Sequence, residues 1–454
     1  MNEKVSRLID SYRDEYVRML QEWVRIPSVK GEPEEGAPFG REVRNMLDRA
    51  MKDASEMGFA VRDVDGYACD ITWGDQAEKV AVLGHLDVVP AGDGWVHQPF
   101  GGEMEDGKIY GRGTGDDKGP ALACLFAMKA IKEAGIPLRR AIRIILGCDE
   151  ESGWEDMAYY QTKHTLPETG FSPDANFPVI NTEKGMLHFV FRAPSAETGF
   201  RILRMQNGER INVIPGDGCA VLEEKEGLKE KIRAWAQETG LPVTANSRED
   251  GLSVTARGIG GHSAYPEGKR NAIGMLLKLF EAMGVCGPLG TLAKTVGMEH
   301  DGKSLGVACE DAVSGPLTCN LGLLKLEDGI WTGTLDLRCP VTADLEEIRK
   351  QVKAHLPGFT VETVEEKAPH HVPADSELVR AVLGAYEEET GMKGEPEATG
   401  GGTYAKVLKQ GVAFGAQFPD EEELAHQPEE CITADRMISA AKIYANALLR
   451  LCAE

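Results

Sequence analysis

The sequence predicts an α/β fold with two domains. One domain has a mostly parallel sheet flanked by helices, and the other is an inserted α+β lid domain with an antiparallel sheet. Two observations carry this prediction. In both end segments of the chain, short apolar runs stop at polar residues and alternate with helical segments. Between residues 186 and 375 the strand-like runs are mostly polar on one side, which is typical of antiparallel sheets.

The first end segment, residues 1–185, opens with two amphipathic helices at about 4–25 and 39–57. The elements expected after them are strands at 59–64, 67–73 and 80–83, a buried alanine-rich helix at 120–134, a strand at 142–147 and a helix at 155–164. The order strand, helix, strand predicts a βαβ unit with parallel strands.

A change of pattern places the inserted domain at residues 186–375. Its expected elements are strands at 187–192, 211–214, 252–256, 318–324, 331–337 and 359–363, and helices at 226–238, 271–283 and 343–355. Residues 376–454 return to the first domain, with a helix near 376–390, a strand at 412–415 and a final helix at 434–451. A chain of 454 residues is too long for one ordinary core, which agrees with two domains.

Composition argues against several classes of partner. The net charge of −23 and a pI near 5.0 disfavour binding to nucleic acid or to an anionic membrane surface. We expect neither a secretion signal nor a transmembrane span. The ten cysteines are scattered without a C-x-x-C pair, which predicts reduced thiols and a cytoplasmic location.

The apolar run 80–83 stops at a glycine that is followed by His85-Leu86-Asp87. His85 and Asp87 are two residues apart, so on an extended backbone their side chains project to the same side. A metal-bound imidazole commonly donates its other N–H to a carboxylate, which makes His85 a candidate ligand supported by Asp87. A surface histidine beside a solvated aspartate is the alternative, and this pair alone does not decide between them.

More histidines and carboxylates fall at predicted strand ends or in loops. The whole set of candidates is His85, Asp116, Glu150, Glu151, Asp174 and His426. Imidazoles and carboxylates without a thiolate fit Zn²⁺, Mn²⁺ or Co²⁺. If Asp116, Glu151 and Asp174 are ligands, two divalent ions and a bridging hydroxide balance their charge, and Glu150 is left as a general base. The plain alternatives are a solvated Glu150–Glu151 pair, a turn residue at Asp174 and a loop histidine at His426.

Five ordered motifs resemble those of the co-catalytic metallopeptidases, the family that includes aminoacylase, succinyl-diaminopimelate desuccinylase and carnosinase. The motifs are Gly84-His85-Leu86-Asp87, Gly111-Arg112-Gly113-x-x-Asp116-Asp117-Lys118-Gly119, Asp149-Glu150-Glu151-Ser152-Gly153, Pro173-Asp174-Ala175 and Ala425-His426-Gln427. The Asp116-Asp117 pair, the segment 177–185 and the chain length are most similar to the bacterial PepV-like dipeptidases, also called Xaa-His dipeptidases.

The resemblance implies a role for each candidate. In the implied metal centre Asp116 bridges two ions, His85 and Asp174 complete one site, and Glu151 and His426 complete the other. Glu150 is the general base, and Asp87 supports the catalytic centre from behind His85. The division of roles between Glu150 and Glu151 rests on the resemblance alone. The family also implies a cis peptide bond after Asp116.

The inserted domain carries motifs of its own. The glycine-rich segment around His262 resembles the lid motif of the family, in which the histidine stabilises the tetrahedral oxyanion. Asn212 and Arg338 match positions that hold the substrate, Arg338 by pairing with its C-terminal carboxylate. Backbone N–H groups of Gly401 and Gly402 are expected at the same carboxylate. The plain alternatives are a histidine in a glycine-rich turn and a surface arginine.

Together these patterns predict a metal-dependent dipeptidase, which hydrolyses dipeptides with a free C-terminus by attack of a metal-bridging water. Two divalent ions are expected, Zn²⁺ first, with Mn²⁺ or Co²⁺ as alternatives. A deacylase of N-acyl amino acids is the alternative among enzymes, and an inactive metal-binding or peptide-binding protein is the alternative outside them. The insertion of about 190 residues is long enough to supply its own lid histidine, so we expect a functional monomer.

Overall fold

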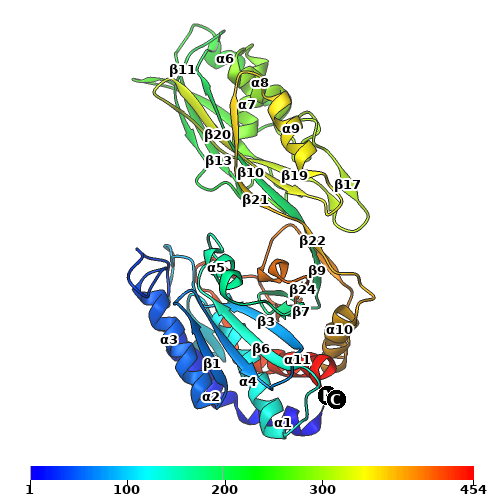
Figure 1. Ribbon diagram of the computed structural model, residues 1–454. Helices are drawn as coiled ribbons and strands as arrows, with labels where there is room; N and C mark the ends of the chain where they lie inside the picture. Colours follow the sequence, from blue (N-terminus) through cyan, green and yellow to red (C-terminus); the bar gives the residue numbers. More distant parts are fainter. Residues whose placement is uncertain (1, 197) are drawn as a thin grey trace. The chain divides into compact units, whose positions relative to one another are not determined.

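The computed structural model describes residues 2–196 and 198–454, and the chain forms two compact units (Figure 1). Unit 1 comprises Met1–Thr182, His371–Glu397 and Gly402–Glu454. Unit 2 comprises Glu183–His370 and Ala398–Gly401. The domain limits drawn from the sequence, after residues 185 and 375, stay a prediction.

Unit 1 is built around a mixed sheet. Its strands, in their order across the sheet, are β1 (Ala60–Val64), β2 (Ala68–Trp73), β6 (Ala141–Gly147), β3 (Lys79–His85), β7 (Thr169–Ser172), β24 (Gln410–Ala413), β9 (Ile180–Glu183) and β22 (His370–His371), and β23 (Glu397–Thr399) also pairs with β9. The neighbours β6, β3, β7 and β24 pair in parallel, whereas β1–β2, β2–β6 and β24–β9 pair antiparallel. The predicted α/β class is confirmed, with parallel pairing confined to the four central strands.

Both faces of this sheet are buried. Successive side chains of a strand point to opposite faces, so Val80 and Val82 of β3 join one apolar core while Ala81 and Leu83 join another. The helices of the first core are α1 (Glu3–Ser11), α2 (Arg13–Val24), α3 (Arg41–Glu56), α4 (Lys118–Ala134), α10 (Glu377–Thr390) and α11 (Ala434–Cys452). The second core lies under α5 (Glu155–Lys163) and the 3₁₀ helix η1 (Tyr404–Val407). Burial on both faces explains why β3 has an apolar run, Val80-Ala81-Val82-Leu83, instead of an alternating pattern.

The predicted βαβ unit is formed by β3, α4 and β6. Helix α4 is buried along most of its length, which agrees with its alanine-rich and apolar sequence. The helix starts directly after Asp117 and ends at Gly135, whose left-handed φ of 72° suits a glycine C-cap. The start of α4 therefore lies next to the Asp116 position.

The N-terminal helix expected over residues 4–25 is divided into α1 and α2. Tyr12 separates them, because its N–H donates to the carbonyl oxygen of Ile9 in the tighter pattern of a 3₁₀ turn. The Tyr12 ring packs against Phe126 of α4, with ring centroids 5.6 Å apart. Packing against α4 thus accompanies a break that helical periodicity alone does not reveal.

Unit 2 contains an eight-stranded sheet in which neighbouring strands pair antiparallel. In order, the strands are β14 (Val243–Arg248), β15 (Gly251–Arg257), β13 (Asp217–Leu222), β11 (Ile202–Asn207), β19 (Thr318–Glu327), β20 (Ile330–Cys339), β10 (Gly185–Pro194) and β21 (Thr360–Lys367). The helices that pack against the sheet are α6 (Leu228–Thr239), α7 (Ala272–Ala282), α8 (Pro288–Thr295) and α9 (Leu345–His355). The predicted antiparallel α+β character is confirmed.

Three strands of this sheet were not expected from the sequence, namely β11, β13 and β14. β11 and β14 mix polar with apolar residues, as in Val243-Thr244-Ala245-Asn246-Ser247-Arg248 of β14, so no apolar run marks them. β13 ends in the short apolar run Cys219-Ala220-Val221-Leu222, which was not interpreted as a strand. The strand expected at 211–214 is shorter, with only Val213–Ile214 in β12, which pairs with β16 (Gly261–His262). Pairing between distant segments, rather than local composition, defines these strands.

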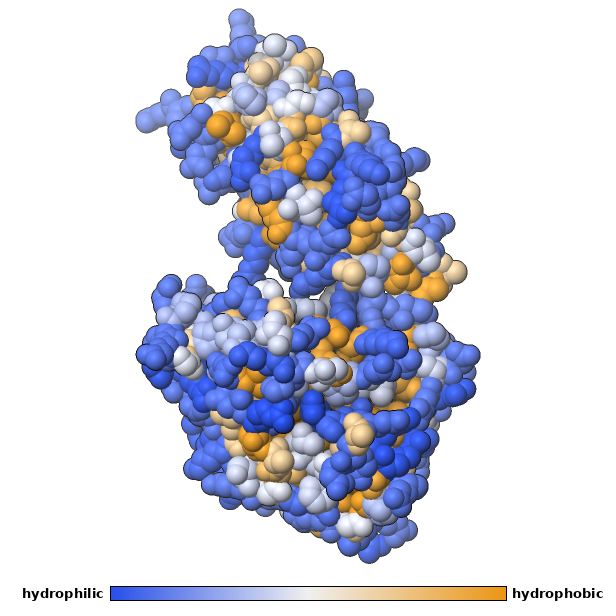
Figure 2. Space-filling model, in the orientation of Figure 1, coloured by the Kyte–Doolittle hydropathy of each residue, from blue (hydrophilic) through white to orange (hydrophobic). Residues whose placement is uncertain are grey.

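Charged and polar side chains, drawn in blue, cover most of the visible face of each unit, and apolar residues occur there in scattered groups (Figure 2). This surface agrees with a charged-residue content of 27%. Across residues 2–196 and 198–454, the helices fall short of the length and apolar content that a membrane crossing requires.

Candidate active site

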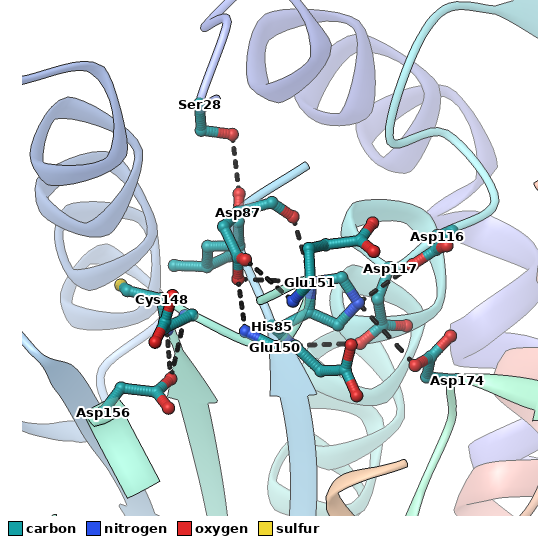
Figure 3. A network of polar contacts seen from close by, with 12 residues as sticks. Ser28, His85, Asp87, Asp116, Asp117, Cys148, Glu150, Glu151, Asp156 and Asp174 are labelled. Atoms are coloured by element: carbon teal, nitrogen blue, oxygen red, sulfur yellow. Dashed lines mark hydrogen bonds and ion pairs between the residues drawn. The ribbon is translucent and has the colours of Figure 1, made fainter. Parts of the chain in front are cut away.

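The carboxyl ends of three neighbouring strands carry candidate residues of unit 1. β3 ends at His85, β6 ends shortly before Glu150 and Glu151, and β7 ends two residues before Asp174. Because these strands are parallel, their carboxyl ends meet at one edge of the sheet. Figure 3 shows these side chains gathered at that edge together with Asp116. The edge of the sheet thus brings together residues that lie far apart in the sequence.

Asp116 lies between two histidines. Its Oδ1 is 2.9 Å from His85 Nε2, and its Oδ2 is 3.0 Å from His426 Nε2. His85 Nε2 is also 3.7 Å from Asp174 Oδ2, and His426 Nε2 is 2.9 Å from Glu151 Oε2. The candidates form two groups that share Asp116, and within each group one ligand atom per residue lies within 4.8 Å of the others. The peptide bond that follows Asp116 is cis, as expected.

The ring of His85 has a defined orientation. Its Nδ1 lies 2.9 Å from the main-chain oxygen of Asp87. A carbonyl oxygen can only accept, so Nδ1 carries a hydrogen, and Nε2 is the ring nitrogen that is directed toward Asp116. This hydrogen bond was expected to go to the carboxylate of Asp87, which instead lies 3.5 Å from Nδ1. The two oxygens of that carboxylate accept the N–H groups of Glu150 and Glu151, each at 3.1 Å.

Glu150 and Glu151 differ in their contacts. Glu151 contacts His426, whereas none of the described residues donates a hydrogen bond to the Glu150 carboxylate. Burial raises the pKa of the Glu150 carboxyl well above its ordinary value, and the charges of Asp174, Glu151 and Asp116 raise it further. A carboxyl group with a raised pKa and without a fixed donor is suited to taking up and returning a proton.

Negative charge accumulates in this cluster. Burial raises the pKa of the Asp174 carboxyl to about 7, and the neighbouring Asp116 carboxylate adds to the rise. Burial acts in the same direction on Asp116, but His426 and His85 outweigh it and hold the pKa of that carboxyl below its usual range. Buried carboxylates in excess over cationic groups favour bound cations. Oxygen and imidazole donors without a thiolate fit Zn²⁺, Mn²⁺ or Co²⁺.

Two buried aspartates support the segment after β6, and sequence reasoning gave them no role. Asp156 accepts the main-chain N–H groups of Cys148 at 2.6 Å and Asp149 at 3.0 Å, and it also accepts the Tyr404 hydroxyl. The Asp149 carboxylate pairs with Lys30 at 2.6 Å. For Asp149 the sequence offered one signal, its position in the motif Asp149-Glu150-Glu151. For Asp156 it offered none, because nothing in the sequence of helix α5 indicates a supporting role.

In unit 2 the strand pair β12–β16 brings Asn212 next to the His262 segment. The N–H of Ser263 donates to the main-chain oxygen of Asn212 at 3.0 Å. The side chain of His262 is exposed, and its Nδ1 accepts the N–H of Ala264 at 3.2 Å. An Nδ1 that accepts leaves the ring hydrogen on Nε2, so His262 presents an N–H donor.

Arg338 lies near the end of β20 with a buried guanidinium group. Its Nε and Nη2 donate to the carboxylate of Asp336 at 2.9 and 3.0 Å, and its Nη1 donates to the main-chain oxygen of Gly400 at 2.9 Å. A guanidinium group has five N–H donors. Three of them are engaged, so two remain that no described residue accepts, one on each terminal nitrogen.

Asp336 is a residue that sequence reasoning missed. It accepts the hydroxyl of Ser263, the neighbour of His262, and its Oδ1 lies 3.2 Å from His188 Nε2. Burial opposes ionisation, but Arg338 and His188 lower the pKa of the Asp336 carboxyl to about 2. One buried carboxylate therefore connects Arg338 with the segment that carries His262.

The glycine loop follows the same network. The N–H of Gly401 donates to Thr399 Oγ1 at 3.0 Å, and the hydroxyl of Tyr265 lies 2.8 Å from the same atom. The Gly401 N–H therefore has an acceptor inside its own loop. Gly402, the other predicted member, begins the last segment of unit 1.

Known proteins are similar to this chain in sequence and in fold. The sequence is 35% identical to the putative dipeptidase YtjP of Bacillus subtilis (strain 168), over 97% of this chain and 97% of that protein. Human carnosine dipeptidase 1 aligns with a TM-score of 0.61 and 18% identity, over 99% of this chain and 98% of that chain. The dipeptidase Dug1p of Saccharomyces cerevisiae aligns with a TM-score of 0.62 and 15% identity, over 98% of each chain.

At such low identities the two solved structures show a common fold alone. The family follows from the sequence, because residues 81–450 match the model for "Peptidase family M20/M25/M40" and YtjP is similar along nearly the full length. The resemblance to co-catalytic metallopeptidases is confirmed, and so is the prediction of a peptidase. This chain therefore belongs to peptidase family M20/M25/M40.

Proposed function

We propose that this protein is a metal-dependent dipeptidase that hydrolyses dipeptides with a free C-terminus. One observation carries the proposal. The two oxygens of Asp116 lie beside two separate imidazoles, those of His85 and His426, so one carboxylate serves two donor groups. A shared carboxylate of this kind suits a hydrolytic centre with two ions, and membership of a peptidase family supports that reaction.

The two donor groups would hold two divalent ions. One ion would be held by His85, Asp116 and Asp174, and the other by Asp116, Glu151 and His426. When bound, the ions would polarise the peptide carbonyl group and lower the pKa of a water molecule. We propose Zn²⁺ first, with Mn²⁺ and Co²⁺ as alternatives, because the donors are imidazoles and carboxylates. Elemental analysis of the purified protein identifies the metal.

Glu150 is the proposed general base and acid. Its main-chain N–H is held by Asp87, while its carboxyl group is free of donors among the described residues. The ionised carboxylate takes a proton from the attacking water, and the protonated form returns it to the leaving amino group. A raised pKa favours the second step, because burial makes the protonated form of this carboxyl group more stable than that of an exposed glutamate.

Arg338 is proposed to bind the C-terminal carboxylate of the substrate. Its two remaining N–H groups, one on each terminal nitrogen, are the number that a bidentate contact with a carboxylate requires. Gly400 contacts Arg338 directly, which places the glycine loop beside the guanidinium group. Since the Gly401 N–H has an acceptor in its loop, we assign the main-chain contact with the substrate to Gly402.

His262 is proposed to stabilise the oxyanion that forms when water attacks the peptide carbonyl group. The hydrogen bond from Ala264 to Nδ1 leaves a hydrogen on Nε2, which is the donor that an oxyanion needs. Asn212 is proposed to bind the substrate beside His262. The Ser263 N–H donates to the main-chain oxygen of Asn212, so Asn212 lies next to the segment that carries His262.

A panel of dipeptides, tripeptides and N-acyl amino acids tests the proposal, assayed with metal-depleted protein reloaded with Zn²⁺, Mn²⁺ or Co²⁺. We expect hydrolysis of dipeptides, and a loss of activity when their C-terminal carboxylate is amidated. Hydrolysis of N-acyl amino acids in place of dipeptides would identify a deacylase, because the same water attack serves any amide. Bound metal without turnover of any substrate would identify an inactive binding protein.

We further propose a functional monomer in the cytoplasm. All ten cysteines are free, which suits a reducing compartment. His262 lies within the long segment that the same chain inserts. A mixture of inactive Glu150→Gln protein and inactive His262→Ala protein tests the monomer. Recovered activity would show that the histidine is donated between chains.

A further inference from the structure

Glu430 carries a buried carboxylate that gathers four donors. The residue is 1% exposed and follows His426 by four positions. Its Oε1 accepts the main-chain N–H groups of Gly113 at 3.0 Å, Gly115 at 2.9 Å and Asp116 at 3.2 Å. Its Oε2 accepts Nη1 of Arg112 at 2.5 Å. One side chain therefore accepts hydrogen bonds from four groups of residues 112–116, which lie more than 300 positions away in the sequence.

These donors fix the main chain from which Asp116 projects. Residues 111–117 lie in turns outside any strand or helix, so no ladder of backbone hydrogen bonds holds this loop. Gly113 has a φ of 87°, a conformation that favours glycine, and the turn it makes directs three N–H groups toward one oxygen. A single buried carboxylate oxygen is suited to accept several such donors. The direction of the Asp116 side chain therefore depends on Glu430.

The same residue holds the loop of His426. The N–H of Gly111 donates to the main-chain oxygen of Glu430 at 2.9 Å. Directly after it, β26 (Cys431–Thr433) pairs with β5 (Lys108–Tyr110), which leads into the Asp116 loop. His426 adopts a left-handed φ angle of 63°, which a non-glycine residue holds when neighbouring contacts impose it. Side-chain and main-chain contacts of Glu430 thus join the two loops on either side of the Asp116–His426 contact.

We propose that Glu430 is a positioning residue for the metal centre, which sets the affinity for the ion shared by Asp116, Glu151 and His426. The inference rests on the proposed function, because it takes Asp116 and His426 as metal ligands. Among the described residues, the hydrogen bonds of Glu430 go to main-chain groups and to Arg112, and none of them goes to a proposed ligand atom. It acts through the main chain of Asp116 and through the loop of His426.

The side chain has to be a carboxylate in this position. Glutamine would keep one oxygen for either the three N–H groups or Arg112, and its NH₂ group would face the donors on the other side. Two donors that face each other in a buried site lose their hydrogen bonds to water without gaining a partner. Glu430→Gln therefore disturbs the loop while it keeps the volume of the side chain. Glu430→Ala removes every contact of the side chain.

Glu429 provides a matched control. Its carboxylate accepts the N–H groups of Val96 at 2.7 Å and His97 at 3.1 Å, and it pairs with the His97 ring at 2.7 Å. It is a neighbour in sequence with a comparable number of hydrogen bonds, but these go to a surface loop rather than to the Asp116 loop. Glu429→Gln should therefore leave metal binding unchanged.

The test measures metal affinity in the full-length chain. Metal-depleted protein is titrated with Zn²⁺ or Mn²⁺ by calorimetry, and the rise in Tm at saturating metal is recorded for the same samples. For Glu430→Gln we expect two metal sites. The site formed by Asp116, Glu151 and His426 should bind its ion about 10–100-fold less tightly than in the unchanged protein, which is the usual effect of replacing a residue that orients metal ligands. We also expect a smaller metal-induced rise in Tm, since an ion stabilises the folded state according to its affinity.

The outcomes separate this inference from the proposed function. If the unchanged protein binds no metal, the proposed function fails. If the unchanged protein and Glu430→Gln bind two ions with the same affinity, only the positioning role is overturned. A variant that melts at a lower temperature without metal, yet shows the full metal-induced rise in Tm, would make Glu430 a residue of the fold alone. Failure of Glu430→Gln, Glu430→Asp and Glu430→Ala to fold would overturn the inference for the same reason.

Discussion

Replacing the two adjacent glutamates by glutamine, one at a time, separates the general base from the metal ligand. Glu151 lies 2.9 Å from His426 and shares a donor group with Asp116, whereas the Glu150 carboxyl contacts no donor among the described residues. Glu150→Gln keeps the size of the side chain and removes only its ability to carry a proton. We expect two ions per chain and a kcat about 10²–10⁴-fold lower, which corresponds to about 2.7–5.4 kcal/mol of activation free energy.

Glu151→Gln should show the opposite pattern, with weaker metal binding and an activity that recovers in part at high metal concentration. The assay is steady-state hydrolysis of a dipeptide, with elemental analysis of the same samples. If Glu150→Gln loses an ion while Glu151→Gln retains both, the two roles are reversed and the reasoning from contacts is refuted. Undiminished turnover of Glu150→Gln would place the base at another residue.

Three further predictions concern Asp116, Arg338 and Asp336. Asp116→Ala should lose both ions, because its two oxygens serve both donor groups, and elemental analysis that finds a full complement would contradict the shared site. Arg338→Lys should lower kcat/KM by about 10–100-fold for substrates with a free C-terminal carboxylate and much less for their amides, because a bidentate charged contact is lost. Equal losses for both substrates would refute this role. Asp336 has a folded-state pKa of about 2, below its ordinary value, so the stability it contributes is present above about pH 4 and is lost as the pH falls through 2. Urea unfolding at pH 5 and pH 3 should therefore show a smaller loss of stability for Asp336→Asn than for the unchanged protein, and equal losses would count against the ion pair.

Much of the fold could be predicted from the sequence, because an apolar run in a short segment indicates a strand that is buried inside a sheet. The apolar runs that stop at His85 and before Glu150 mark strands buried on both faces, and parallel pairing then brings their ends to one edge of the sheet. The α/β class was predicted for that reason and is confirmed. The strand before Asp174, β7, was not predicted, because Thr169-Gly170-Phe171-Ser172 is not an apolar run. The strands β11 and β14 were not predicted, because polar residues interrupt their apolar pattern.

The supporting residues of the site could not be found in this way. Glu430 accepts hydrogen bonds from the main-chain N–H groups of Gly113 and its neighbours. Almost any residue type can donate such a bond, so no spacing in the sequence predicts the contact. Asp336 lies two residues before Arg338 on a strand, and its bond to Ser263 depends on a loop that returns from a distant segment. Every residue except proline has a main-chain N–H group, so hydrogen bonds from these groups cannot be predicted from residue types and become visible only in the structure.

The place of β24 in the sheet bears on how the protein is made. This strand lies between β7 and β9, although its residues Gln410–Ala413 come close to the C-terminus. A nascent chain can therefore pair β2, β6, β3 and β7 long before β24 leaves the ribosome, and until then β7 has an open edge. His426 lies 13 positions after Ala413, the end of β24, so the growing chain obtains its last central strand shortly before its last proposed ligand. A chain cut short before Gln410 would be prone to aggregate through that edge instead of persisting as a metal-binding fragment.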